Sequence, residues 1–104
     1  MITFKEFLKN THGKGEYGFH MRPMITCADG FSMSVQGSEG HYCEPRSISL
    51  TYVSMEIGYP SEVEPLLLPY QESSADPTES VYGYVPVEVI EQVINKHGGI
   101  ATHF

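Results

Sequence analysis

The sequence has no tryptophan, only two cysteines and few basic residues. Six Lys and Arg stand against 13 Asp and Glu, which gives a net charge of −7. Proteins that bind nucleic acid generically show the reverse balance, so this charge argues against that class. No apolar run approaches the roughly 20 residues of a membrane helix, and no N-terminal stretch has the pattern of an export signal. We therefore expect a cytoplasmic protein in which the thiols of Cys27 and Cys43 stay reduced.

The length of 104 residues suits one compact domain, residues 1–104, and is too short for two separate cores. Aromatic residues make up 12% of the chain, and seven Tyr outnumber five Phe. Because Tyr joins an apolar ring to a polar tip, this bias suits a binding surface, a subunit interface or a core finished with Tyr. The small core also leads us to expect a homo-oligomer.

Two segments predict helices, one near each end of the chain. In residues 3–10, Thr3 and Glu6 have the spacing of a capping box. In the C-terminal segment, Pro86 suits the first helical position and two consecutive glycines end the pattern. Both segments carry an apolar stripe at helical spacing, made of Phe4, Phe7 and Leu8 in the first and of Val89, Ile90, Val93 and Ile94 in the second.

The middle of the chain predicts antiparallel strands. Residues 19–27 alternate, with Phe19, Met21, Ile25 and Cys27 expected inside and Arg22 outside, and residues 31–37 alternate again after a turn signal. Residues 47–60 predict a third strand, with a register shift near Val53 that indicates a bulge. Residues 61–80 read as loop, and residues 81–86 as a short strand. The predicted fold is α+β: a small antiparallel sheet of three to four strands, flanked by a short N-terminal helix and a C-terminal amphipathic helix.

The loop "GSEGHYCEPRS", residues 37–47, carries five chemically distinct side chains within six consecutive positions. A metal site built from His20, Cys27, His41 and Cys43 is one interpretation, but only the last two have the close spacing of zinc ligands. A Cys43 nucleophile is another, since neighbouring positive charge lowers the pKa of a thiol. Packed thiols and polar histidines explain the same residues, so we predict no catalytic residue, no cofactor and no metal.

A ligand-binding surface is the third interpretation of this loop. Arg22 and Arg46 are the only arginines, and guanidinium groups suit phosphate or carboxylate. Tyrosines would stack on a base, and Gly83 between two of them lets another group approach the backbone. The alternative is that both arginines pair with surface acids. The predicted ligand-binding residues are Arg22, Gln36, His41, Tyr42, Arg46, Tyr82 and Tyr84, with Asp29 and Ser34 as further candidates for hydrogen bonds.

Three stretches carry a resemblance to known sequences. "TCADGFSMSVQGSEGHYCEPR", "GYPSEVEPLLLPY" and "VYGYVPVEVIEQVINKHGGI" together resemble a family of small proteins from tailed bacteriophages and prophages. The resemblance brings no catalytic residues with it. It implies a phage accessory protein that acts in the host cytoplasm.

Small phage proteins of this kind often resemble antagonists of bacterial defence. We therefore predict a non-enzymatic binding protein that sequesters a nucleotide-derived immune signal. The alternatives are an inhibitor that binds a host defence protein, similar to anti-CRISPR proteins, and an enzyme that degrades the signal with Cys43 or His41 at its centre. A structural role in virion assembly is a further alternative. The predicted partners are a small nucleotide-derived ligand or a host protein, with no direct nucleic-acid or membrane binding.

Overall fold

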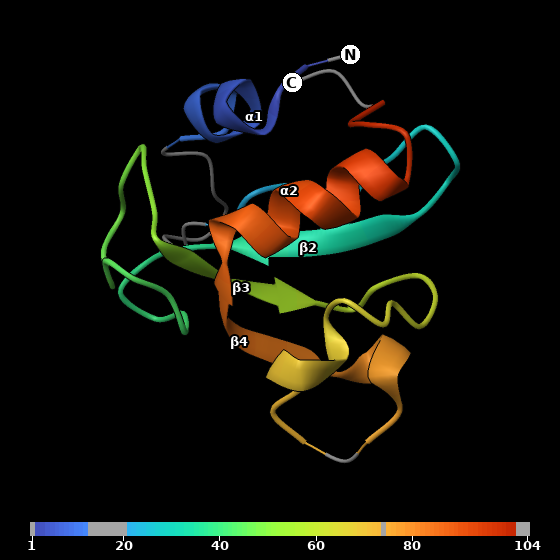
Figure 1. The fold of residues 1–104 in the computed structure, drawn as a ribbon. Helices are drawn as coiled ribbons and strands as arrows, with labels where there is room; N and C mark the ends of the chain where they lie inside the picture. Colours follow the sequence, from blue (N-terminus) through green and yellow to red (C-terminus); the bar gives the residue numbers. More distant parts are fainter. Residues whose placement is uncertain (1, 13–20, 74, 102–104) are drawn as a thin grey trace.

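The computed structural model describes residues 2–12, 21–73 and 75–101. Its elements are α1 (Phe4–Asn10), β1 (Ile25–Thr26), β2 (Ser32–Gln36), β3 (Ser54–Gly58), β4 (Val81–Pro86) and α2 (Val87–Lys96), with short 3₁₀ turns at Leu68–Tyr70 and Pro77–Glu79. The four strands form one antiparallel sheet in the order β1-β2-β3-β4 (Figure 1). The predicted α+β fold is confirmed, including the hairpin of β1 and β2. No helix in the described ranges is long and apolar enough to cross a membrane.

The core lies between one face of the sheet and the two helices. α2 crosses this face, and α1 lies beside it (Figure 1). Strand residues of the same parity point to this side, since successive side chains of a strand alternate between faces. The fully buried apolar residues include Met33, Val35, Met55, Ile57 and Val85 from the strands and Ile90 and Val93 from α2. The apolar stripe predicted for α2 therefore faces the sheet.

Both helices begin and end close to their predicted positions. At α1 the hydroxyl of Thr3 accepts from the backbone N–H of Glu6, and the Glu6 carboxylate accepts from that of Thr3, both at 3.1 Å. At α2, Pro86 is the N-cap residue of the helix and also the last residue of β4. The helix ends at Lys96, and Gly98 follows with φ +90°. These ends rest on local chemistry, which explains why they were predictable.

The first predicted strand is much shorter than expected. Of residues 19–27 only Ile25–Thr26 form β1, while residues 19 and 20 lie outside the described part of the chain. Met21 was predicted to be inside but is 48% exposed, and Arg22 was predicted to be outside but is 6% exposed. The side chain of Gln36 bonds both backbone groups of Arg22, at 2.7 and 2.8 Å. This pairing replaces a strand ladder and turns Arg22 inward.

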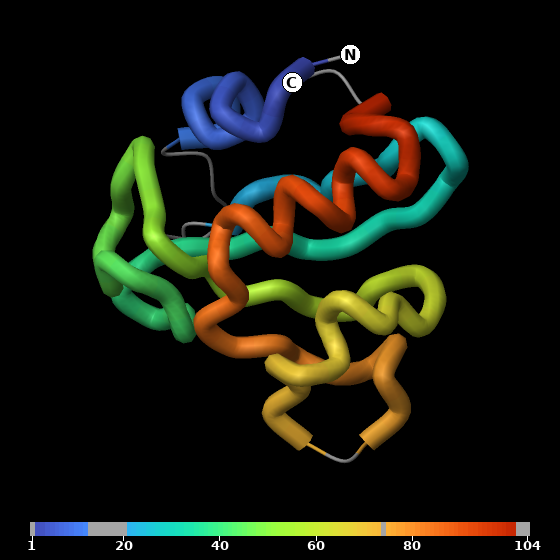
Figure 2. Tube along the Cα trace, viewed as in Figure 1, coloured from blue at the N-terminus to red at the C-terminus, as the bar shows by residue number. Residues whose placement is uncertain are grey.

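The third strand also begins later than predicted. β3 starts at Ser54, and Leu50, expected on the apolar face, is 52% exposed. The Tyr52 hydroxyl accepts from the Ser49 N–H at 2.9 Å and lies 2.8 Å from the Ser47 carbonyl, to which it donates. These contacts fold the segment back on itself as a loop. Figure 2 shows this loop at one end of the sheet, beside the start of α2, where the Val87 N–H donates to the Val53 carbonyl.

The bulge lies between β3 and β4, and its extra residue is on β4. Met55 pairs with Val85 and Ile57 pairs with Tyr82, so a step of two residues on β3 faces a step of three on β4. Gly83 and Tyr84 therefore both lie opposite Glu56, and Tyr84 has φ +52°. A regular strand would direct Tyr82 and Tyr84 to the same face. With the bulge, Tyr82 is fully buried and Tyr84 is 43% exposed.

Candidate functional site

The bulge brings Tyr84 against the loop of residues 37–47. The backbone N–H of Tyr84 donates to the Tyr42 carbonyl at 3.0 Å, and the two rings stack with centroids 5.9 Å apart. The Tyr42 N–H donates to the Glu56 carboxylate at 3.3 Å. Glu56 alternates with Met55 and Ile57, so this contact lies on the side of the sheet away from the core. We call Tyr42, Arg46, Glu56, Glu72 and Tyr84 the tyrosine cluster.

The lack of a side chain at Gly83 lets the residues of the cluster lie close together. A Cβ atom at this position would collide with the Glu72 carboxylate and would lie 3.2 Å from the Cβ of Tyr42. Glycine leaves room for both residues where they lie, and a larger residue would require the Glu72 side chain to move. The close approach that the sequence indicated at Gly83 is therefore made by groups of the chain itself.

Arg46 lies on the outside of this cluster. Its guanidinium carbon is 5.6 Å from the centroid of the Tyr42 ring, and its Nε donates to the Glu39 carbonyl at 3.2 Å. The side chain is exposed, as predicted. Neither Arg46 nor Arg22 forms an ion pair within the described residues, so the alternative in which the arginines pair with surface acids is not seen there.

The His41 side chain makes contacts that stabilise the loop of residues 37–47. Its Nδ1 lies 2.6 Å from the Ser38 hydroxyl, and its Nε2 lies 3.9 Å from a Glu56 oxygen. The residue types are those of a Ser-His-acid triad, but the geometry suits a turn. Ser38 is buried, and its hydroxyl accepts from the Gly40 N–H at 3.1 Å. The distance from the His41 Nε2 to the Glu56 oxygen is too long for a hydrogen bond. The three side chains therefore shape the loop that carries Tyr42.

Arg22 and Gln36 lie apart from the cluster, in a buried polar network. The Arg22 guanidinium donates to the Thr11 hydroxyl at 3.1 Å, to the Gly37 carbonyl at 3.4 Å and to the Ser49 carbonyl at 3.3 Å. The Gln36 side chain forms hydrogen bonds with the backbone N–H and carbonyl of Arg22. Because these donors are directed at groups of the protein, the structure does not bring Arg22 and Arg46 together around one ligand.

Tyr82 is also separated from the other predicted residues. Its ring is fully buried, and its hydroxyl donates to the Pro77 carbonyl. Burial, followed by the charge of Asp76, raises the pKa of the Tyr82 hydroxyl. Tyr82 thus belongs to the core. Of the seven predicted ligand-binding residues, the structure brings together His41, Tyr42, Arg46 and Tyr84.

Both cysteines are buried thiols. Burial and the nearby Asp29 carboxylate raise the pKa of Cys27 to about 11. Burial also raises the pKa of Cys43, whose thiol donates to the Ser38 carbonyl at 3.3 Å. A nucleophile needs an accessible thiolate, and neither thiol offers one. Within the described residues no three His, Cys, Asp or Glu side chains are placed to hold a metal, and His20 lies outside them.

The sequence reasoning missed a partly buried ionic network at the end of α2. The His97 Nδ1 lies 2.6 Å from Asp29, and its Nε2 lies 2.8 Å from Glu64. Glu64 is 1% exposed and also accepts from the Lys96 ammonium at 3.0 Å and from the Leu66 N–H at 2.9 Å. We call Asp29, Glu64, Lys96 and His97 the histidine network. It joins the β1–β2 turn and the loop after β3 to the end of α2.

The contacts of His97 favour its charged form. Burial opposes the charge, but hydrogen bonds to Asp29 and Glu64 outweigh this effect and raise the pKa of His97. The Glu64 carboxyl is likewise opposed by burial, but the donors from Leu66, His97 and Lys96 lower its pKa. With a carboxylate at each ring nitrogen, the imidazole donates from both. The ring also stacks on Phe31, with centroids 4.1 Å apart.

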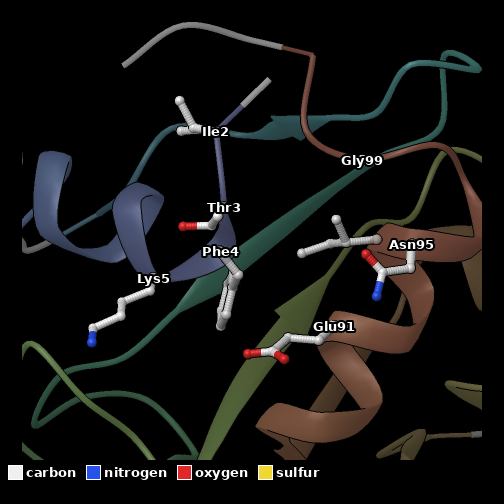
Figure 3. Close-up of a pocket in the computed structure, with 8 residues that line it drawn as sticks. Ile2, Thr3, Phe4, Lys5, Glu91, Asn95 and Gly99 are labelled. Atoms are coloured by element: carbon white, nitrogen blue, oxygen red, sulfur yellow. The ribbon is translucent and has the colours of Figure 1, made fainter.

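A hollow of about 300 Å³ lies between α1 and α2 (Figure 3). Phe4 from α1 and Glu91 from α2 extend toward each other across it, while Lys5 extends away along α1. None of the predicted ligand-binding residues lines it. The hollow is therefore separate from the tyrosine cluster.

Comparison of the chain with family models, curated proteins and solved structures gives no match. The functional assignment therefore depends on the geometry of the molecule itself. Two features of that geometry stand out. One is the histidine network, in which the buried Glu64 and His97 are paired with each other and with the partly exposed Lys96 and Asp29. The other is the exposed tyrosine cluster on the opposite side of the sheet from the core.

Proposed function

We propose that this protein is a non-enzymatic binding protein that recognises another protein through its tyrosine cluster. The observation that carries the proposal is the stacked pair of exposed tyrosines, in which Tyr84, with φ +52° and a ring 43% exposed, lies against the Tyr42 ring. Such a backbone conformation costs about 1–3 kcal/mol and persists where the surrounding structure imposes it, often at functional sites. The exposed ring adds little to the core, so stability does not account for its placement.

The composition of the cluster supports a protein partner. Tyr and Arg are the residue types that contribute most to binding at protein interfaces, and here two tyrosines and Arg46 lie in contact. The cluster holds two carboxylates and one guanidinium, in a chain of net charge −7. Complementary charge speeds association and suppresses wrong partners, so a basic partner surface is favoured.

The resemblance to phage proteins makes a host defence protein in the host cytoplasm the predicted partner. That part of the proposal, like the predicted homo-oligomer, rests on the sequence alone.

A second candidate function is sequestration of a nucleotide-derived signal at the same surface. The observation that favours it is the stacking of Arg46 on Tyr42. In this case Arg46 would hold a phosphate and Tyr84 would stack on the base. This candidate lacks the second arginine, since Arg22 is buried elsewhere.

One experiment separates these candidates. The tagged protein is recovered from infected, defence-positive cells, its bound proteins are identified, and small molecules released by heat are analysed by mass spectrometry. We expect a stoichiometric protein partner that Tyr42→Ala and Tyr84→Ala each release. The matched control is Tyr59→Ala, because Tyr59 is 56% exposed with φ +51° and lies outside the cluster.

The outcomes differ clearly. A partner that survives both cluster substitutions contradicts the proposed surface. A nucleotide recovered in stoichiometric amount and lost with Arg46→Ala would instead support the second candidate.

A further inference from the structure

Glu72 is the carboxylate of the tyrosine cluster for which the described part of the chain supplies no donor. Its backbone N–H donates to the Val81 carbonyl at 3.0 Å, which fixes the residue at the edge of β4. Its side chain is exposed and lies over Gly83, beside Tyr42. Among the described residues no hydrogen bond or ion pair reaches this carboxylate. Glu56, by contrast, already accepts from the Tyr42 N–H.

The aromatic rings of the cluster already hold one cation. The Arg46 guanidinium lies over the Tyr42 ring at 5.6 Å, within the range of a cation–π contact. The second ring, Tyr84, is 43% exposed, and no described arginine or lysine lies over it. An exposed tyrosine pair beside a carboxylate that has no partner among the described residues offers a cation two favourable contacts, one with a ring face and one with the carboxylate.

We infer that the cluster binds a cationic side chain, an arginine or lysine of the protein partner, between the stacked tyrosines and Glu72. The inference rests on the proposed function and specifies the chemistry of the partner. The charge of the surroundings favours this occupant: Glu56 and Glu72 lie within the cluster, Arg46 is its single guanidinium, and the whole chain carries −7. The same charges oppose an anionic ligand.

The test uses a blocked peptide with three arginines as the probe. A second peptide has citrulline at the same positions, which keeps the shape and removes the charge. Each is titrated into the isotope-labelled full-length protein at low ionic strength, and backbone and tyrosine signals are followed by NMR. We expect shifts of Tyr42, Glu72 and Tyr84 with the arginine peptide and none with the citrulline peptide.

Variants test the role of the carboxylate. Glu72→Gln should weaken binding of the arginine peptide about threefold or more, as expected for loss of one exposed charge contact. The matched control is Glu91→Gln, which removes the same charge from an exposed residue of α2 that lies outside the cluster, at the hollow between the helices. It should leave the affinity unchanged. Equal weakening by both variants, or equal binding of the citrulline peptide, would overturn the inference.

Failure of this inference is distinguishable from failure of the proposed function. If Tyr84→Ala releases the protein partner and Glu72→Gln binds the arginine peptide as tightly as the parent protein does, the surface is correct and the cation contact is wrong. If Tyr84→Ala retains the partner, the proposed function itself fails. Because Glu72 is exposed and Gln has the same shape, the thermal melt of Glu72→Gln should match that of the parent protein and show that the fold is intact.

Discussion

The histidine network and the tyrosine cluster use similar groups in opposite ways. Each combines two carboxylates with basic side chains, two in the network and one in the cluster. Glu64 is 1% exposed and receives three donors, whereas Glu72 is exposed with none among the described residues. Burial makes an unpaired charge costly, so a buried cluster persists only when its charges are matched. At the surface an unpaired carboxylate is hydrated by water and costs little free energy. A complete network inside therefore indicates a structural role, while unsatisfied groups outside are free for a partner.

The largest effect on stability is expected at the centre of the histidine network. Glu64→Gln removes the buried charge that faces both His97 and Lys96. We expect it to lower the free energy of unfolding by about 3 kcal/mol, because His97 loses one of its two close carboxylates and two charge-assisted hydrogen bonds are weakened. Urea denaturation followed by circular dichroism measures the change.

Glu62→Gln is the matched control for this prediction. Its carboxylate lies 4.0 Å from the same imidazole, but the side chain is 64% exposed. We expect a change within about 0.5 kcal/mol, as for other surface positions. If Glu64→Gln and Glu62→Gln lowered the free energy of unfolding by similar amounts, a buried ion pair of the network would contribute no more to stability than one at the surface.

The two arginines test the same difference between buried and exposed groups, with smaller expected effects on stability. Arg22→Ala removes the guanidinium that donates to the Thr11 hydroxyl and to two backbone carbonyls. We therefore expect the free energy of unfolding to fall by about 2 kcal/mol. Arg46→Ala removes an exposed side chain and should cost at most about 0.5 kcal/mol while weakening partner binding. Thermal melts and partner titrations of both variants measure the two effects. An equal loss of stability in the two variants would contradict the difference in burial.

These arginines also show how far the sequence could be interpreted. Nothing near either position distinguishes a buried guanidinium from an exposed one, because the acceptors of Arg22 come from residues 11, 37 and 49. The histidine network is equally non-local, since 68 positions separate His97 from Asp29. The separation of Tyr82 from Tyr84 depends on the β4 bulge, whereas the alternation pattern indicated one near Val53. The ends of the helices and the hairpin were predictable, because capping residues and turn residues act within a few positions.

The pH dependence of stability tests the network as a whole. The pKa of His97 is raised above 6.5, so its contribution is complete below pH 6.5 and is lost as the pH rises through the raised value. The pKa of Glu64 is lowered below 4.5, so its contribution is present above pH 4.5 and is lost as the pH falls through the lowered value. These two groups together predict the highest stability between about pH 4.5 and pH 6.5.

A series of thermal melts across this range measures the effect. His97→Gln should remove the alkaline loss, because the titrating imidazole is gone, although the variant is less stable throughout. An alkaline loss of the same size in His97→Gln would assign it to another group. Asp29, whose pKa is lowered chiefly by the Phe31 N–H and then by His97, should affect mainly the acid side.

Only a small net change in stability is expected at Tyr84, and this position tests the comparison most directly. Tyr84→Gly relieves a left-handed conformation that costs about 1–2 kcal/mol, but it removes a ring contact with Tyr42 of about 0.5–1.5 kcal/mol. The two effects nearly cancel, so the free energy of unfolding should stay within about 1 kcal/mol of the parent value while partner binding is lost. Urea denaturation and a partner titration of the same sample measure both. If Tyr84→Gly unfolds as readily as Glu64→Gln, the exposed ring supports the fold, and the tyrosine cluster belongs with the histidine network as a structural feature.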